Sequence, residues 1–210
     1  MSVIAPTVTA YDTHQYREQL ERVEGFAKRI HIDVMDGIFA PTKSPPLASL
    51  WLPESIICDL HIMYQHPENC FKDIIRLKPS LVIVHAEAQC DIPLFAGELA
   101  NHGIRTGIAL LQDTSVKDHI SDIHACSHCL IFSGKLGFHG GVADLSLLKK
   151  IDDIHSTHPE IEIGWDGGIQ KNNIKELAGY VDVLNVGGAI QHANDPLNAY
   201  SMLVKALHEA

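Results

Sequence analysis

The amino-acid sequence predicts an α/β fold, a single (β/α)8 TIM barrel in which eight parallel strands are surrounded by helices. Three observations predict it. Short apolar runs rich in β-branched residues alternate with longer amphipathic stretches. The apolar runs are continuous rather than alternating, as in parallel sheets covered by helices. Eight such units fit within 210 residues, at the short end of the range for this barrel. A doubly wound open sheet is the alternative architecture.

The expected elements follow one another along the whole chain, so we expect one domain over residues 1–210. The expected strands are residues 3–8, 29–33, 57–62, 81–85, 105–110, 129–133, 161–165 and 181–186. The expected helices are residues 14–26, 67–77, 93–101, 145–158, 172–179 and 196–208. Asp195 before Pro196 has the residue types of a helix N-cap and first helical position, and Asp144 and Asn172 are further candidate caps.

Composition excludes several classes of function. A formal net charge of -10 argues against a nucleic-acid partner, which requires a basic surface. No apolar run approaches the roughly 20 residues of a membrane-spanning helix, so we expect no membrane partner. The first residues lack the pattern of a signal peptide, and five irregularly spaced cysteines do not suggest a disulfide framework. We therefore expect a cytoplasmic protein.

The most informative segment is His31-Ile32-Asp33-Val34-Met35-Asp36-Gly37. Because side chains alternate along a strand, His31 and Asp33 share one face and can reach one metal ion. A second histidine, His61, and a second aspartate, Asp166, stand at the ends of two other apolar runs. Two imidazoles and two carboxylates form the ligand set of a catalytic metal site, with carboxylates available for proton transfer.

These ligand types suit Zn²⁺, Fe²⁺, Mn²⁺ or Co²⁺ better than Ca²⁺ or Mg²⁺. We therefore expect one divalent transition metal ion. The competing interpretation is that the two histidines are buried core groups with satisfied hydrogen bonds. Glycines that follow the last three expected strands expose backbone N–H groups suited to phosphate, although glycine pairs also occur in ordinary turns. They are Gly137, Gly140, Gly141, Gly167, Gly168, Gly187 and Gly188.

The chain resembles the ribulose-phosphate 3-epimerase family nearly end to end. The long motif that begins at His31, with Phe39 and Pro41, carries most of the resemblance. The other segments are Asp59-Leu60-His61-Ile62-Met63, His85-Ala86-Glu87-Ala88, Gly107-Ile108-Ala109, Gly137-Phe138, Asp166-Gly167-Gly168 and Gly187-Gly188-Ala189-Ile190.

The resemblance implies a barrel of the ribulose-phosphate-binding type and an isomerase of carbohydrate metabolism in the pentose phosphate pathway. It implies a metal-dependent epimerase that interconverts D-ribulose 5-phosphate and D-xylulose 5-phosphate through a metal-stabilised enediolate. His31, Asp33, His61 and Asp166 would be metal ligands, and Asp33 and Asp166 also the catalytic acid and base. Met35 and Met63 would line the substrate site or simply pack in the core. A phosphorylated ketose would be the partner, and relatives imply a homo-oligomer, a dimer or larger.

The chain departs from the family pattern at the substrate end. In the first strand, Ala10 stands where the family has a second serine. After the sixth strand, Leu136 replaces a proline, the family's glutamine is missing and His139 is inserted. Lys135 and His139 could contact phosphate or be solvated loop residues. These changes keep two alternatives open, a ketohexose-phosphate 3-epimerase and a non-catalytic sugar-phosphate-binding paralogue.

Two further readings are weaker. A lyase on a related barrel would need a lysine two residues after Asp33, where Met35 stands. Cys126 and Cys129, flanked by His124 and His128, resemble half of a zinc site, but no second pair completes it. We expect these two cysteines to be buried structural thiols, and His85 and Glu87 to support the site rather than to act in catalysis.

Overall fold

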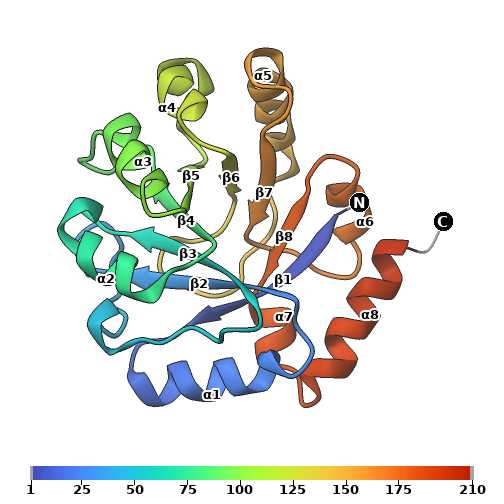
Figure 1. The fold of residues 1–210 in the computed structure, drawn as a ribbon. Helices are drawn as coiled ribbons and strands as arrows, with labels where there is room; N and C mark the ends of the chain where they lie inside the picture. The colour runs from blue at the N-terminus through green and yellow to red at the C-terminus, as the bar shows by residue number, and fades with distance from the viewer. Residues whose placement is uncertain (1, 209–210) are drawn as a thin grey trace.

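A computed structural model describes residues 2–208 and confirms the predicted barrel. Eight parallel strands pair in sequence order, and the last strand pairs with the first, so that the sheet is closed. Figure 1 shows the strands gathered at the centre with the helices around them. The strands are β1 (Val3–Thr9), β2 (Arg29–Met35), β3 (Ile57–Met63), β4 (Leu81–His85), β5 (Arg105–Leu110), β6 (His128–Phe132), β7 (Glu162–Asp166) and β8 (Val183–Val186).

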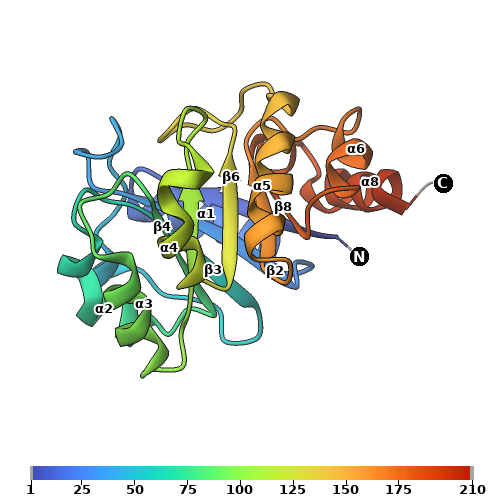
Figure 2. The same ribbon diagram turned by 90° about the horizontal axis from the view of Figure 1, so that it is seen from above.

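The helices lie outside the strands, and in the view turned by 90° α2 and α3 lie at one side of the strands and α6 and α8 at the other (Figure 2). They are α1 (Thr13–Glu24), α2 (Phe71–Leu77), α3 (Ile92–Ala100), α4 (Ile120–His124), α5 (Lys149–Thr157), α6 (Ile174–Ala178), α7 (Gly188–Gln191) and α8 (Pro196–His208). Short 3₁₀ turns occupy Leu47–Ser49, Pro67–Cys70, Val116–His119 and Leu145–Leu148. Within residues 2–208, none of these helices has the length and apolar character needed to cross a bilayer.

Most expected elements are confirmed to within a few residues, and the differences have local causes. Asp195 caps α8 by accepting a hydrogen bond from Asn198 N, as expected. The prediction that Asn172 caps a helix is wrong, because Asn173 is the residue that precedes α6. The Asn173 side chain accepts a hydrogen bond from Gln170 N and donates one to Gly168 O. The short helices α4 and α7 were not expected. With five and four residues, they are too short to show a helical period.

The barrel interior is divided between apolar and polar side chains. Leu81, Ile83, Ala109 and Leu130 form a small apolar cluster contributed by β4, β5 and β6. The strands β1, β2 and β3 instead bring polar residues inside, because Thr9 pairs with Asp33 and Asp33 pairs with His61 in the register of the sheet. The alternation of side chains therefore carries the polar groups of neighbouring strands to one level of the barrel.

A network of charged side chains fills the opposite end of the barrel, near the beginnings of the strands. The Arg29 guanidinium donates to Asp59 (2.6 Å) and to both carboxylate oxygens of Glu162 (2.8 and 2.9 Å). His128 Nδ1 lies 2.9 Å from Glu162 Oε2. Burial opposes the charged form of Glu162, but hydrogen bonds from Arg29 and His128 outweigh it and hold the pKa of Glu162 well below its usual range. The space for the His128 ring depends on Gly164, where a Cβ atom would lie 2.6 Å from Nε2.

We expect the substitution Glu162→Gln to destabilise the protein by about 3 kcal/mol, because it leaves the buried charge of Arg29 without its bidentate partner. For a chain of this size, that corresponds to a fall in Tm of roughly 6–12 °C. Thermal unfolding at neutral pH measures the change. Glu160→Gln, at an exposed neighbouring glutamate, is the matched control and should leave Tm within about 2 °C of the unsubstituted protein. Equal Tm values for the two variants would contradict the stabilising role of the network.

Candidate active site

A cavity of about 520 Å³ opens at the carboxyl ends of the strands. This is the end of such barrels where catalytic residues lie. Most of the residues predicted from the sequence line it: Asp33, Met63, Gly137, Gly140, Gly141, Asp166, Gly167, Gly168, Gly187 and Gly188. Of the other predicted residues, His31 and His61 are fully buried beside Asp33, and Met35 packs with Met63 beneath the loop that follows β2.

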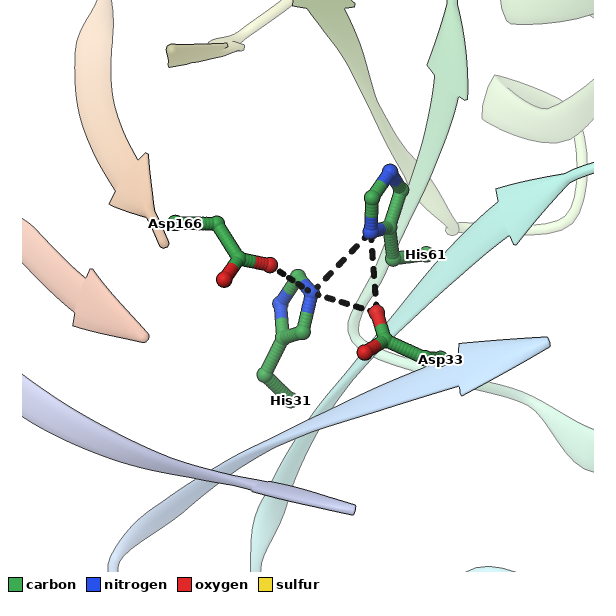
Figure 3. Close-up of side chains that lie close together, drawn as sticks. All are labelled: His31, Asp33, His61 and Asp166. Atoms are coloured by element: carbon green, nitrogen blue, oxygen red, sulfur yellow. Dashed lines mark hydrogen bonds and ion pairs between the residues drawn. The ribbon is translucent and has the colours of Figure 1, made fainter. Parts of the chain in front are cut away.

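The four predicted metal ligands come together, each offering one atom within 4.8 Å of the others. His31 Nε2 lies 3.2 Å from Asp33 Oδ1, 3.5 Å from Asp166 Oδ2 and 3.3 Å from His61 Nδ1. His61 Nδ1 lies 3.0 Å from Asp33 Oδ1. Figure 3 shows the carboxylates of Asp33 and Asp166 on opposite sides of the His31 imidazole, with Asp33 also contacting His61.

This donor set fits a divalent metal ion. Two imidazole nitrogens and two carboxylate oxygens converge on one point, and both imidazoles are completely buried. Nitrogen and oxygen donors of these types bind Zn²⁺, Fe²⁺, Mn²⁺ or Co²⁺. Two carboxylates this close in a buried site also repel each other unless positive charge lies between them. The geometry therefore allows His31, Asp33, His61 and Asp166 to hold one cation.

The two carboxylates have opposite proton affinities. Burial opposes ionisation of Asp33, but hydrogen bonds with His31 and His61 outweigh it and hold the pKa of Asp33 far below its usual range. Burial and the negative charge of Asp33 raise the pKa of Asp166. Two carboxyl groups with separated pKa values suit a site where one accepts a proton while the other can donate one.

Behind the cluster, a chain of hydrogen bonds fixes the orientation of His61. His61 Nε2 lies 2.9 Å from Nε2 of His85, whose Nδ1 lies 3.3 Å from Glu87 Oε2. If His61 binds a metal ion through Nδ1, its proton is on Nε2 and donates to His85. His85 then carries its proton on Nδ1 and donates to Glu87. Such outer partners fix the tautomer of a ligating histidine and make it a stronger ligand.

Glu87 is itself held in place. Its Oε1 accepts hydrogen bonds from Leu111 N (3.0 Å) and from the Thr114 hydroxyl. The buried Lys150 ammonium donates to the carbonyls of Leu111 (2.6 Å) and Thr114 (2.8 Å), which fixes the same turn. Burial opposes ionisation, but the partners His85 and Thr114 and the Leu111 N–H outweigh it and lower the pKa of Glu87 to about 2. Glu87 is therefore a fixed negative charge at the end of the series of hydrogen bonds that begins at His61.

Thr9 is a residue of the site that was not predicted from the sequence. The polar first-strand position was assigned to Ala10, but Ala10 is buried, whereas Thr9 lines the cavity and donates from Oγ1 to Asp33 Oδ2 at 2.6 Å. The alternation of side chains along β1 was the available signal, since Thr7 and Thr9 face inward together.

The two glycines at the end of β7 allow another segment of backbone to approach them closely. Gly167 and Gly168 have φ values of +107° and +70°, where other residues are strained. Cβ atoms there would collide with the backbone of Gly134 and Ala143, in the loop between β6 and α5. We name residues 134–143 of this connection the β6 loop. The glycine pair therefore lets the β6 loop pack tightly against the end of β7.

Within the β6 loop, the structure separates the two residues that the sequence analysis treated together. Lys135 is exposed, and its ammonium lies 4.7 Å from the centre of the Phe138 ring. His139 is half-buried and lines the cavity, so its interpretation as a solvated residue is wrong.

The cysteines of the half zinc site are buried free thiols, as expected. Cys126 and Cys129 are almost inaccessible, and burial raises the pKa of Cys126 to about 12. Within residues 2–208, they belong to no group of side chains that could hold a metal ion.

Comparison with known proteins agrees with this geometry. The model of the ribulose-phosphate 3 epimerase family matches residues 3–191. A ribulose-phosphate 3-epimerase of Aquifex aeolicus is 28% identical, over 99% of this chain and 97% of that protein. The ribulose-phosphate 3-epimerase of Encephalitozoon cuniculi is 31% identical, over 79% of this chain and 76% of that protein.

Solved structures share the fold at low sequence identity. The structure of KGPDC from Streptococcus mutans has a TM-score of 0.70 at 12% identity, covering 99% of this chain and 97% of that one. A chain in a structure of Mycobacterium tuberculosis tryptophan synthase has a TM-score of 0.74 at 9% identity, covering 100% of this chain and 93% of that one. At these identities the likeness supports the barrel fold alone.

We expect Glu87→Gln to weaken binding of Zn²⁺ or Mn²⁺ by about 10- to 100-fold, because the substitution removes the charge that orients His85 and His61. Competition with a chromophoric chelator measures the affinity. Glu98→Gln, at an exposed glutamate of α3, is the control and should bind the metal as the unsubstituted protein does. An unchanged affinity in the Glu87 variant would show that the hydrogen bonds from His61 through His85 to Glu87 do not affect metal binding.

The same carboxylate should make the metal-free protein sensitive to acid. The pKa of Glu87 is lowered by folding, so its stabilising contribution is complete above the unfolded pKa of about 4.3 and is lost as the pH falls toward the folded value. Chemical denaturation should therefore show the largest stability difference between the metal-free protein and its Glu87→Gln variant above about pH 5, shrinking below about pH 4. If the stability difference between the two proteins does not change with pH, the ionised Glu87 carboxylate does not stabilise the folded state.

Proposed function

The chain belongs to the ribulose-phosphate 3-epimerase family of carbohydrate isomerases, and we propose that it is a metal-dependent enzyme that interconverts D-ribulose 5-phosphate and D-xylulose 5-phosphate. One observation supports this most strongly. Two carboxylates approach the same buried imidazole, His31, from opposite sides, at the wall of a cavity large enough for a sugar phosphate.

Epimerisation beside a carbonyl removes a proton from one face of the carbon and returns one to the other face. Asp33 and Asp166 are the proposed base and acid, exchanging roles with the direction of the reaction. Without the ion, the pKa of Asp33 is low and the pKa of Asp166 is raised, and a bound cation would favour the ionised form of both carboxyls. The hydrogen bond from Thr9 to Asp33 leaves the other oxygen, Oδ1, facing the imidazoles. Positioned acid and base groups of this kind typically accelerate proton transfer by about 10² to 10⁴.

The resident metal ion would be held by His31, Asp33, His61 and Asp166. When bound, a divalent transition metal supplies positive charge that stabilises the enediolate form of the substrate. The family membership and the mixed nitrogen and oxygen donors support Zn²⁺, Fe²⁺, Mn²⁺ or Co²⁺. The buried chain from His61 to Glu87 adds a negative charge that strengthens the imidazole as a ligand.

The phosphate of the ketose would lie away from the carboxylates, among the glycines that line the rest of the cavity. Gly167 and Gly168 follow β7, Gly187 follows β8 and Gly188 begins α7, at the end of such barrels where loops commonly bind phosphate. Gly140 and Gly141 of the β6 loop face the same cavity. Met63 and Phe132 supply apolar walls near the reacting carbon and help to exclude water.

We expect the protein, loaded with Mn²⁺ or Zn²⁺, to exchange the C3 proton of D-ribulose 5-phosphate with D₂O and to form D-xylulose 5-phosphate. Proton NMR follows both events. Asp33→Asn and Asp166→Asn should each lower epimerisation at least about 10²-fold, because each removes one of the two proton-transfer groups. Exchange that survives in a variant should be limited to the epimer whose proton faces the remaining carboxylate.

Metal content, measured on each variant before the assay, separates loss of the acid or base from loss of the ion. Glu18→Gln on the exposed face of α1 is the control for substitution itself. The proposed function is wrong if the metal-loaded protein shows no exchange at C3, or if both aspartate variants epimerise at the original rate.

A further inference from the structure

Besides its packing against the end of β7, the β6 loop forms hydrogen bonds with the opposite side of the barrel mouth at two places. The carbonyl of Gly137 accepts hydrogen bonds from the Thr42 hydroxyl (2.8 Å) and the Tyr11 hydroxyl (3.3 Å). Two residues further on, His139 Nε2 donates to the carbonyl of Thr9 at 3.1 Å. His139 therefore connects the β6 loop directly to Thr9, the last residue of β1.

The ring of His139 extends from β1 to β8. Its Nδ1 lies over Gly187, where a Cβ atom would approach it to 2.6 Å, so the imidazole occupies the space that any other residue at 187 would need. Beside it, His192 packs edge to face, with ring centres 5.7 Å apart. Both imidazoles line the cavity. The side chain of His139 thus forms part of the wall between the ends of β1 and β8.

This position lies between the two functional ends of the proposed site. Thr9, which accepts the hydrogen bond from His139, is the residue whose hydroxyl donates to Asp33. Gly187, on which the ring rests, belongs to the glycines proposed to bind phosphate. A ketose phosphate that reaches from Asp33 to Gly187 must therefore pass along the His139 ring.

We propose that His139 is a specificity-determining residue that limits the length of the ketose phosphate, favouring five-carbon over six-carbon substrates. The proposal rests on the proposed function and deepens it. A ketohexose 6-phosphate has one more carbinol group between C3 and phosphate than a ketopentose 5-phosphate. The imidazole is hydrogen-bonded to the Thr9 carbonyl and packs over Gly187, so the wall cannot retreat to admit that group without losing the hydrogen bond.

Two substitutions separate the volume of the ring from its hydrogen bond. His139→Gly removes both and opens the wall. His139→Gln keeps an N–H donor able to reach the Thr9 carbonyl and much of the volume. His14→Gln, at an exposed histidine of α1, is the matched control.

The first measurement compares kcat/KM for C3 proton exchange of D-ribulose 5-phosphate and D-fructose 6-phosphate. We expect His139→Gly to shift the ratio toward the six-carbon substrate by about tenfold or more, the usual value of one small group in a fitted site. The glutamine variant and the His14 control should retain the preference for five carbons. An unchanged ratio in the glycine variant overturns the proposal.

A second measurement tests the attachment of the loop without any catalysis. Lys135 is an exposed trypsin site within the β6 loop, so the rate of cleavage after it reports how often the loop opens. Cleavage should be faster in His139→Gly than in His139→Gln or the control. Equal rates in all the proteins would overturn the part of the proposal in which the hydrogen bond holds the wall in place.

The two hypotheses fail in distinguishable ways. Absence of exchange with either substrate refutes the proposed function, and calorimetric binding of both sugar phosphates to the metal-free protein then measures the preference for length directly. Turnover of D-ribulose 5-phosphate with no effect of His139→Gly on the ratio leaves the epimerase standing and refutes the role of His139. A shift confined to the glycine variant supports both.

Discussion

The structure depends on the placement of two carboxylates and two imidazoles within one buried site. Four such groups are stable together only if their charges and protons are arranged by their surroundings. The register of the sheet provides the first part, because pairing of Thr9 with Asp33 and of Asp33 with His61 brings three strands to the same level. Hydrogen bonds provide the second part. Thr9 donates to Asp33, and His61 is linked through His85 to Glu87, which is itself held by the backbone N–H of Leu111.

The two ends of the barrel use charge for different purposes. Around Arg29, the charged groups are paired and hydrogen-bonded among themselves, which closes the end of the barrel where the strands begin. At the opposite end, the carboxylates of Asp33 and Asp166 face a cavity and differ in proton affinity. The first arrangement supports stability and the second leaves charge available for binding and proton transfer. The β6 loop completes the site, packing on the glycines after β7 and contacting β1 through His139.

Many of the strands and site residues could be predicted because the sequence patterns that determine them are local. Continuous apolar runs predicted the strands, with β4 and β5 at the residues expected, and a two-residue spacing placed His31 and Asp33 on one face. Where the signal depends on which side of a strand faces inward, the prediction was less reliable. Ala10 was chosen over Thr9 by matching a family pattern, whereas the alternation along β1 puts Thr9 inside. The position of the His139 side chain could not be predicted from neighbouring residues, because its partners Thr9 and Gly187 are distant in sequence.

The sequence by itself determined the number and order of the strands, the closed barrel they predict, the ligand set and the resemblance to the family, because periodicity and motif spacing are properties of neighbouring residues. Only the tertiary structure decided how these residues meet. The low pKa of Asp33 arises from hydrogen bonds with His31 and His61 that outweigh its burial, and the raised pKa of Asp166 arises from burial and the charge of Asp33. The orientation of His61 arises from His85 and Glu87, and the wall at His139 from contacts between β1, the β6 loop and β8. Electrostatic and steric effects act through space, so they exist only once the barrel has closed.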